Sequence, residues 1–313
     1  MDISQKLLIF VVDLLFPLAI GYWCRRRNYF NEAFFSRMIT LNVLVLYPVL
    51  SILSFWVMRL NSELIWLPFL GVFTSLIAGL AAYPRARAKY AGGLDQGSYI
   101  LSAILSNHLT LGGLCVFILY GETGFAYVQL IVLFYNLVVF LFCYPLAQYY
   151  RRRNQPGGSG LSFKAVLFNR NQLPVLGVAI GIFLYAGGLP RPAWATAVFD
   201  PLVHIAAWTA LIPVGYSADF TEMQKYWRDM IDLSFIKFLV TPLCTFALGT
   251  LLLQDPIALN TLVVVASTPT AINAVITVRL HDLNLHLAMA AFVLTTALFL
   301  LLVYPSLFFL MLH

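Results

Sequence analysis

A run of small polar residues interrupts an apolar stretch near the C-terminus. Residues 266–275 read ASTPTAINAV, and polar side chains surround Pro269 at Ser267, Thr268, Thr270 and Asn273. Pro269 has no amide hydrogen and clashes with the preceding turn, so a continuous helix through it would leave backbone groups unpaired in a membrane. Thr268 followed by Pro269 is typical of an N-cap and a first helical residue, which predicts that a half-helix begins there. The positive end of such a helix attracts an anion without any Lys or Arg. The alternative is a proline kink in a packed helix.

A second polar interruption lies in an earlier apolar stretch, where residues 106–113 read SNHLTLGG. Asn107 is a candidate cap, and Gly112 with Gly113 are candidates for the break itself. Two half-helix N-termini that meet near the middle of a membrane would form an anion site. Without this second interruption, a simple kink at Pro269 would be the preferred interpretation.

Other polar residues in the apolar stretches have two interpretations each. His108 could contact a substrate or sense protons, or it could be a neutral histidine hydrogen-bonded between helices. Asn42 and Tyr47 could face a substrate, although packing around a kink at Pro48 is favoured. Asp13 should line a cavity or lie near an interface, because a carboxylate that faces lipid is costly.

Motifs for enzymatic or metal chemistry are absent from the sequence. The cysteines have no CxxC spacing, so neither a zinc site nor a disulfide framework is predicted; they are Cys24, Cys115, Cys143 and Cys244. No paired carboxylates, HExxH motif, glycine-rich phosphate loop or nucleophile motif is present. We therefore expect no enzyme activity, no cofactor and no metal site.

The composition indicates an integral membrane protein. Of the 313 residues, 61% are hydrophobic and only 10% are charged, whereas soluble domains have about 25% charged residues. The net charge of +6 comes from short basic clusters between apolar runs, as in the cytoplasmic loops of membrane proteins. Nucleic acid is therefore excluded as a partner, and the lipid bilayer is the expected surrounding.

The apolar runs predict ten membrane spans. A helix needs about 20 apolar residues to cross the bilayer core. Runs of this kind lie at about 4–23, 38–57, 64–84, 97–120, 124–148, 172–189, 196–216, 232–253, 257–279 and 285–311. The fifth and sixth are joined by a segment with three arginines, a flexible QPGGSG and the amphipathic LSFKAVLFNRN. That segment is either an interfacial helix or a plain linker.

Basic residues predict the orientation of the spans. Sixteen of the 19 Lys and Arg residues, Lys237 among them, are assigned to loops after odd-numbered spans. Because cytoplasmic loops collect positive charge, these loops should be cytoplasmic and both termini should lie outside. The prediction is a multi-pass protein of the cell membrane.

An odd number of spans in each half predicts an inverted repeat. Tyr144-Pro145 matches Tyr304-Pro305 at an offset of 160 residues, and the two polar interruptions have a similar offset. We divide the chain into a first five-helix repeat at 1–150, a cytoplasmic linker and interfacial segment at 151–171, and a second repeat at 172–313. The predicted fold class is an all-α integral membrane protein with ten helices in two inverted repeats and with broken, crossing helices four and nine.

The segments 106–140, 208–220 and 266–305 resemble the auxin efflux carrier family, which is related to bile-acid/sodium symporters. The resemblance covers all ten spans and implies that spans four and nine cross at the substrate site while a transport domain moves against a scaffold. It implies site roles for Asn107, Pro269, Asn273 and Asn136, and a possible homodimer through the scaffold. The chain departs from the family pattern at Leu114, where a second proline is usual, so the first break is expected at Gly112 and Gly113.

The predicted substrate-binding residues come from both interruptions and from spans two and five. They are Asn42, Tyr47, Asn107, His108, Thr110, Gly112, Gly113, Asn136, Thr268, Pro269, Thr270 and Asn273. The expected function is secondary transport of a small organic anion, either auxin-like or a dicarboxylate, by an elevator mechanism. Proton coupling or uniport is favoured, because spans four and nine have no Asp or Glu in their apolar interiors. The alternatives are a sodium-coupled symporter and a membrane ligand sensor that does not transport.

Overall fold

The described chain folds into helices that are arranged in two layers. The computed structural model describes residues 3–58, 61–154, 173–218 and 220–312, and within them the one β-type pairing is an isolated bridge. Seven helices are long and apolar enough to cross a membrane, and α11 and α16 are shorter apolar helices. Many large apolar side chains lie on the outer surface, including Leu251, Phe183 and Leu310. An apolar exterior of this kind is suited to lipid.

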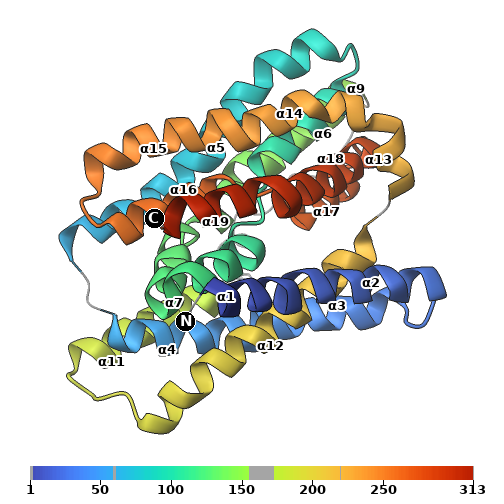
Figure 1. The fold of residues 1–313 in the computed structure, drawn as a ribbon. Helices are drawn as coiled ribbons and strands as arrows, with labels where there is room; N and C mark the ends of the chain where they lie inside the picture. Colours follow the sequence, from blue (N-terminus) through green and yellow to red (C-terminus); the bar gives the residue numbers. More distant parts are fainter. Residues whose placement is uncertain (1–2, 59–60, 155–172, 219, 313) are drawn as a thin grey trace.

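One layer contains the helices from the start of each half of the chain (Figure 1). Its members are α1 (Ile3–Phe10), α2 (Phe16–Arg27), α3 (Glu32–Leu41), α4 (Tyr47–Val57), α11 (Leu173–Ala186) and α12 (Ala193–Ser217). We call this group the first layer. Within it α2 packs against α12, and α4 packs against α11.

The second layer contains most of the remaining helices (Figure 1). Its members are α5 (Trp66–Lys89), α6 (Gly93–Ile104), α9 (Tyr144–Asn154), α13 (Phe220–Tyr226), α14 (Ile231–Phe235), α15 (Thr241–Leu252), α16 (Pro256–Ala266), α17 (Ile272–Leu280), α18 (Leu285–Leu298) and α19 (Tyr304–Leu312). Between the layers runs α7 (Gly113–Ile131), which the short α8 (Tyr135–Val138) follows in the chain (Figure 1). The layers therefore meet along α7.

Glycines allow the first-layer helices to pack at short distance. A Cβ placed on Gly215 would lie 2.1 Å from the backbone oxygen of Leu18 in α2. Gly177 and Gly181 form a GxxxG pair in α11, and a Cβ on Gly177 would lie 2.5 Å from the backbone oxygen of Pro48. No real side chain fits at such distances, so these glycines set the separation of the helices, as small residues do in membrane proteins.

Five helices restart at an X-Pro pair after one wide, π-helical turn. These turns span Val11–Leu15, Asn42–Leu46, Val139–Cys143, Ile236–Val240 and Phe299–Val303. A proline cannot donate a backbone hydrogen bond, and a wider turn accommodates the missing bond without ending the helix. Tyr144-Pro145 and Tyr304-Pro305 are two of the five sites. The two matching dipeptides thus have the same local structure.

The described helices differ from the ten predicted spans in four places. Residues 108–152 form one largely helical stretch, but Gly121, at φ 63° and ψ −147°, breaks it between the predicted fourth and fifth spans. Within the described part of the predicted sixth span, the helical residues are the 14 of α11. The predicted fourth span is divided between α6 and α7, and the predicted ninth span is divided between α16 and α17. The interfacial segment predicted within 151–171 lies almost entirely outside the described residues.

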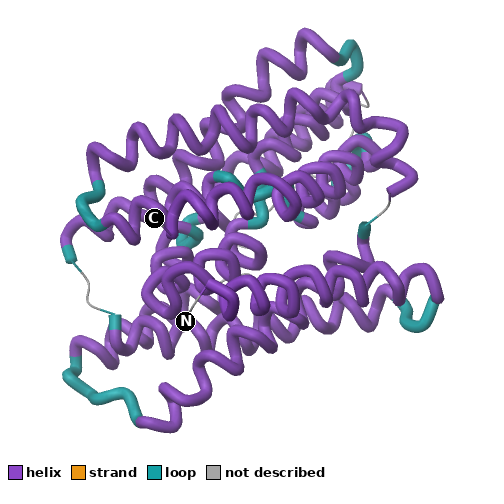
Figure 2. Tube along the Cα trace, in the orientation of Figure 1, coloured by secondary structure: helices purple, strands orange, loops and turns teal. Residues whose placement is uncertain are grey.

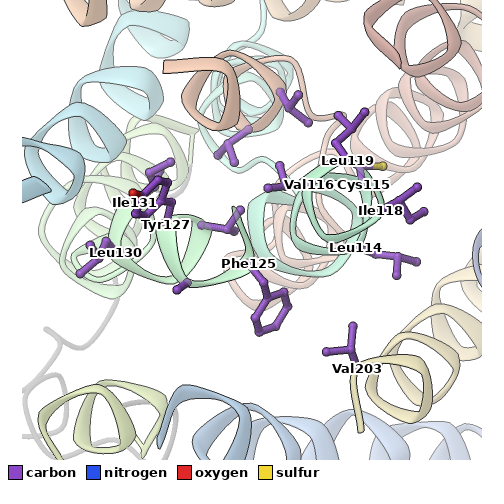
Figure 3. Packing of buried hydrophobic residues seen from close by; sticks show 14 of the residues in the cluster. Leu114, Cys115, Val116, Ile118, Leu119, Phe125, Tyr127, Leu130, Ile131 and Val203 are labelled. Atoms are coloured by element: carbon purple, nitrogen blue, oxygen red, sulfur yellow. The ribbon is translucent and has the colours of Figure 1, made fainter. Parts of the chain in front are cut away.

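A buried apolar cluster fills the space where α7 meets its neighbours. Leu114, Val116, Ile118 and Phe125 belong to it, and Figure 3 shows Phe125 pointing from α7 toward Val203 of α12. In lipid, such packing rather than exclusion of water supplies much of the association between helices.

Candidate functional site

Two helices are interrupted at the same place in the interior, and their interruptions pair with each other. Helix α6 ends at Ile104, and the next helical turn, η4, spans His108–Gly112. Helix α16 ends at Ala266, and α17 begins at Ile272. Figure 2 shows the resulting loop segments in the middle of the helical bundle.

Backbone hydrogen bonds join these two extended stretches. The Asn107 amide donates to the Pro269 carbonyl at 2.9 Å, and the Ala271 amide donates to the Leu105 carbonyl at 2.8 Å. Ser106 and Thr270 form an antiparallel bridge between them. The interruptions therefore satisfy each other's polar groups, which buried backbone requires.

Asn107 caps the helical turn that follows the first interruption. Its side-chain oxygen accepts from the amide of Leu111 at 3.4 Å, and its carbonyl accepts from Gly112 at 3.1 Å. Gly112 and Gly113 are helical, so the expectation that they form the break is wrong. The chain breaks earlier because Asn107 can cap a new helix there, while Gly112 allows close approach of Thr268.

The predicted helix start at Thr268 and Pro269 is also wrong, because α17 begins three residues later with Ala271 as its cap. Pro269 instead belongs to the extended stretch, where its carbonyl accepts from Asn107. Pairing with the first interruption thus prevails over the local capping preference. Ala271 has no side chain that could cap the first turn of α17.

We call the paired stretches 105–107 and 269–271 the crossing. Thr268 and Thr270 make hydrogen bonds that stabilise it, and neither residue lines the nearby cavity. The hydroxyl of Thr270 donates to the Ser102 carbonyl at 2.8 Å, and its amide donates to the Thr295 hydroxyl at 3.0 Å. Thr268 donates to the Val265 carbonyl at 2.7 Å. Both threonines are fully buried.

His108 ties the first interruption to α16. Its Nδ1 lies 3.1 Å from the Val265 carbonyl and 3.0 Å from the Thr268 hydroxyl, and its ring meets that of Tyr135 edge-on. A carbonyl can only accept, so Nδ1 bears the hydrogen and Nε2 is the acceptor nitrogen. This Nε2 is buried without a hydrogen-bond partner among the described residues. The geometry is that of a histidine hydrogen-bonded between helices.

A cavity of about 420 Å³ lies beside the crossing. Seven of the predicted residues line it: Asn42, Tyr47, Asn107, His108, Thr110, Asn136 and Asn273. The other five, Gly112, Gly113, Thr268, Pro269 and Thr270, are not among its lining residues. Sequence reasoning did not identify Ser106, Gln129, Tyr135 and Thr277, which also line the cavity. Of these, Ser106 follows directly from the polar interruption that contains Asn107.

Two cavity residues come from the first layer and already have partners. The Tyr47 hydroxyl lies 3.2 Å from the Thr110 hydroxyl, which connects α4 to the turn after the first interruption. The Asn42 side chain lies 2.7 Å from the Thr209 hydroxyl of α12. Asn42 therefore packs against α12 and also lines the cavity.

The cavity has polar groups but no charged side chain among its lining residues. A basic residue lies directly behind it. Lys237 is 1% exposed, and its ammonium donates to the Ser106 hydroxyl at 2.6 Å and to the Ala103 carbonyl at 3.1 Å. The assignment of Lys237 to a cytoplasmic loop is therefore wrong, since it lies in the π-helical turn Ile236–Val240.

Away from the cavity, polar contacts join the first layer to α7 at the edge formed by the turn at Gly121. Arg191 donates with both terminal guanidinium nitrogens to the Glu122 carboxylate and also donates to the Leu53 carbonyl at 3.0 Å. Lys6 donates to the Leu119 carbonyl at 3.0 Å. These contacts connect the first layer to both sides of the turn in α7.

Asp13 is buried inside the first layer. Its carboxylate accepts from Trp208 Nε1 at 2.8 Å and lies 2.5 Å from His204 Nδ1. Asp13 is not among the residues that line the cavity at the crossing. Its partners satisfy the charge that burial would otherwise make costly.

Comparison with known proteins gives one informative similarity. No protein-family model matches the chain. The chain is similar to an uncharacterized transporter of Methanothermobacter thermautotrophicus, with 23% identity over 293 residues, which span 92% of this chain and 93% of the relative. With the seven long apolar helices, this similarity supports the assignment of the chain as a multi-pass membrane transporter.

Proposed function

We propose that the chain is a secondary transporter for a small organic anion that binds in the cavity beside the crossing. The observation that most supports this proposal is the bridge between Ser106 and Thr270, which brings two helix starts to one uncharged polar cavity. An anion is favoured at helix starts because unpaired amides and the helix dipole point toward it.

Three groups have the chemistry to bind a carboxylate. The first turn of α17 has no side-chain cap. Its Ala274 amide donates to the Ala271 carbonyl at 3.0 Å, which leaves the amides of Ile272 and Asn273 for a ligand or water. The oxygen of Asn107 is used in capping, which leaves its amide hydrogens for the cavity. Asn273 lies in that first turn with an exposed side chain. Donors without acidic neighbours favour a carboxylate over a cation.

The positions of the cavity and the Arg191–Glu122 pair support alternating access. The cavity extends past Tyr144 and Thr277, toward the ends of α9 and α17 that bear Arg151 and Arg279. By the positive-inside rule this is the cytoplasmic side. The pair Arg191–Glu122 joins the first layer to α7 at the other side. We propose that this is the inward-facing state of an elevator in which the second layer, with the crossing and α7, moves against the first.

The coupling that we favour is to protons or to none. No Asp or Glu lines the cavity, so the carboxylate ligands that a sodium ion usually requires are missing there. The resemblance to auxin efflux carriers supports carboxylates as the substrate class, with auxin-like acids and dicarboxylates as the two groups to test. A homodimer through the first layer and a position in the cell membrane with both termini outside complete the proposal.

A binding screen with matched variants tests the site. Purified protein is heated with acetate, malonate, succinate, benzoate or indole-3-acetate, at two pH values and with sodium or choline as the cation. We expect one of these carboxylates to raise the melting temperature, and we expect Asn107→Ala and Asn273→Ala to weaken that effect. Asn260→Ala is the control, because Asn260 bonds Tyr120 away from the cavity.

The result is interpreted together with flux into vesicles. Variants at Asn107 and Asn273 that stay folded and keep full affinity would contradict the proposed site. A ligand that binds but is not carried into proteoliposomes would favour a sensor over a transporter.

A further inference from the structure

Lys237 is a buried basic residue whose two hydrogen-bond acceptors are both uncharged. It is 1% exposed, and it forms no ion pair with a described carboxylate. Its two acceptors are the Ser106 hydroxyl and the Ala103 carbonyl. A lysine in the interior of a membrane protein is costly, so its retention indicates a function.

The acceptors place the ammonium at the carboxyl end of α6. Ala103 is the penultimate residue of that helix, and its carbonyl is one of the last four, which have no intrahelical partner. The negative end of the helix dipole stabilises a cation at this position. Two oxygen acceptors beside a helix end would also suit a bound alkali cation, and here the ammonium uses both.

Ser106 connects this charge to the cavity. It lines the cavity, pairs with Thr270 at the crossing, and accepts the hydrogen bond from Lys237. One hydroxyl group therefore separates the ammonium from the space where a ligand would bind. A positive charge at this short distance acts through a medium of low polarity, in which electrostatic attraction is stronger than in water.

We propose that Lys237, acting through Ser106, is the counter-charge of the cavity and restricts it to anionic ligands that bind without a metal cation. This inference rests on the proposed function and adds the residue that determines charge selectivity. Lys237 is a positioning residue, because its ammonium contacts Ser106 and not the cavity itself. With this counter-charge, a cavity without charged walls would discriminate between an acid and its neutral analogue.

Two substitutions separate the charge of Lys237 from its hydrogen bonds. Lys237→Gln keeps a donor but removes the charge, and Lys237→Met removes both. Arg87→Gln is the control, because it removes the same charge from an exposed side chain of α5. Binding of malonate and of its neutral analogue malonamide is measured by calorimetry for each purified protein, in sodium chloride and in choline chloride.

We expect the unmodified protein to bind malonate equally in both salts and to reject malonamide. Both Lys237 variants should lose about tenfold or more in malonate affinity, with a smaller preference for malonate over malonamide. Arg87→Gln should change neither quantity. The ratio of the two affinities is decisive, because general damage to the fold weakens the binding of malonate and malonamide together and leaves this ratio unchanged.

The outcomes distinguish this inference from the proposed function. If the unmodified protein binds malonate and Lys237→Gln keeps the same preference, the charge has no role and this inference alone fails. If only Lys237→Met loses affinity for malonate, the hydrogen bonds of Lys237 matter and its charge does not, so the inference also fails. If the unmodified protein binds malonate only in sodium chloride, a metal cation is required for binding, and the inference that Lys237 takes its place fails. If it binds none of the carboxylates in the wider screen, the proposed function fails and this inference with it.

Discussion

The ion pair between Arg191 and Glu122 should be strongly coupled, and its two partners should differ in how much they cost when removed. The side chain of Arg191 is 6% exposed, whereas that of Glu122 is 27% exposed. In Glu122→Ala the guanidinium stays buried and keeps only neutral acceptors, the Leu53 carbonyl and the Thr196 hydroxyl. In Arg191→Ala the carboxylate is near enough to the surface to be hydrated.

The expected magnitudes follow from this difference in burial. Breaking a fully buried pair costs about 3–5 kcal/mol, and the two neutral acceptors of Arg191 reduce this to about 2–3 kcal/mol for Glu122→Ala. Arg191→Ala should cost about 1–2 kcal/mol, since the remaining charge is partly solvated. The double variant should resemble Arg191→Ala, so the coupling energy should equal the cost of Glu122→Ala, about 2–3 kcal/mol.

The assay is thermal unfolding of the four purified proteins in one detergent, analysed as a double-mutant cycle. The double variant should melt at a higher temperature than Glu122→Ala alone, because it no longer contains a buried unpaired charge. Additive losses would refute this reasoning. So would Arg191→Ala being the more damaging single change. The proposed alternating access requires this pair to separate. Glu122→Ala should therefore also shift the equilibrium toward the state that is open to the outside, by a free energy similar to the coupling energy of the pair.

Two further predictions concern packing and pH. Gly215→Ala should destabilise the protein by about 2–3 kcal/mol in thermal unfolding, because its Cβ would overlap the backbone of Leu18, and the control Gly92→Ala, whose Cβ would make ordinary contacts, should cost less than about 0.5 kcal/mol. Burial, with a smaller effect of Arg151, lowers the pKa of His281 at the end of α17. The folded state therefore prefers the neutral ring, and its stability is complete above the unfolded-state pKa of about 6.5 and falls below it. Melting curves at about pH 7.5 and 5.5 should show this loss in the parent and a smaller one in His281→Gln.

Hydropathy predicted most of the helices because a membrane imposes a minimum length on each apolar run. The interruptions were also predicted, since Pro269 and the polar residues beside it cannot continue a helix in lipid. Their exact form was not predicted. Thr268 before Pro269 has the local pattern of a helix start, yet the extended pairing with residues 105–107 moves the start to Ile272. A contact between segments about 160 residues apart leaves no signal in local sequence.

The candidate site was predicted in part for a similar reason. Asn107 and Asn273 were identified because amides are unusual in apolar runs, and both line the cavity. Thr270 has the same composition signal, but its hydroxyl bonds the Ser102 carbonyl. Lys237 was missed because a positive charge near the end of a span is normally assigned to a cytoplasmic loop. Only the hydrogen bond from its ammonium to the Ala103 carbonyl of α6 shows that the side chain points inward.

The crossing is fastened by main-chain groups, and this has an evolutionary consequence. Amide and carbonyl groups at 105–107 and 269–271 are present whatever side chains the positions bear, so the junction itself survives most substitutions there. Selection can then alter the neighbouring amides and hydroxyls to suit another ligand without rebuilding the frame.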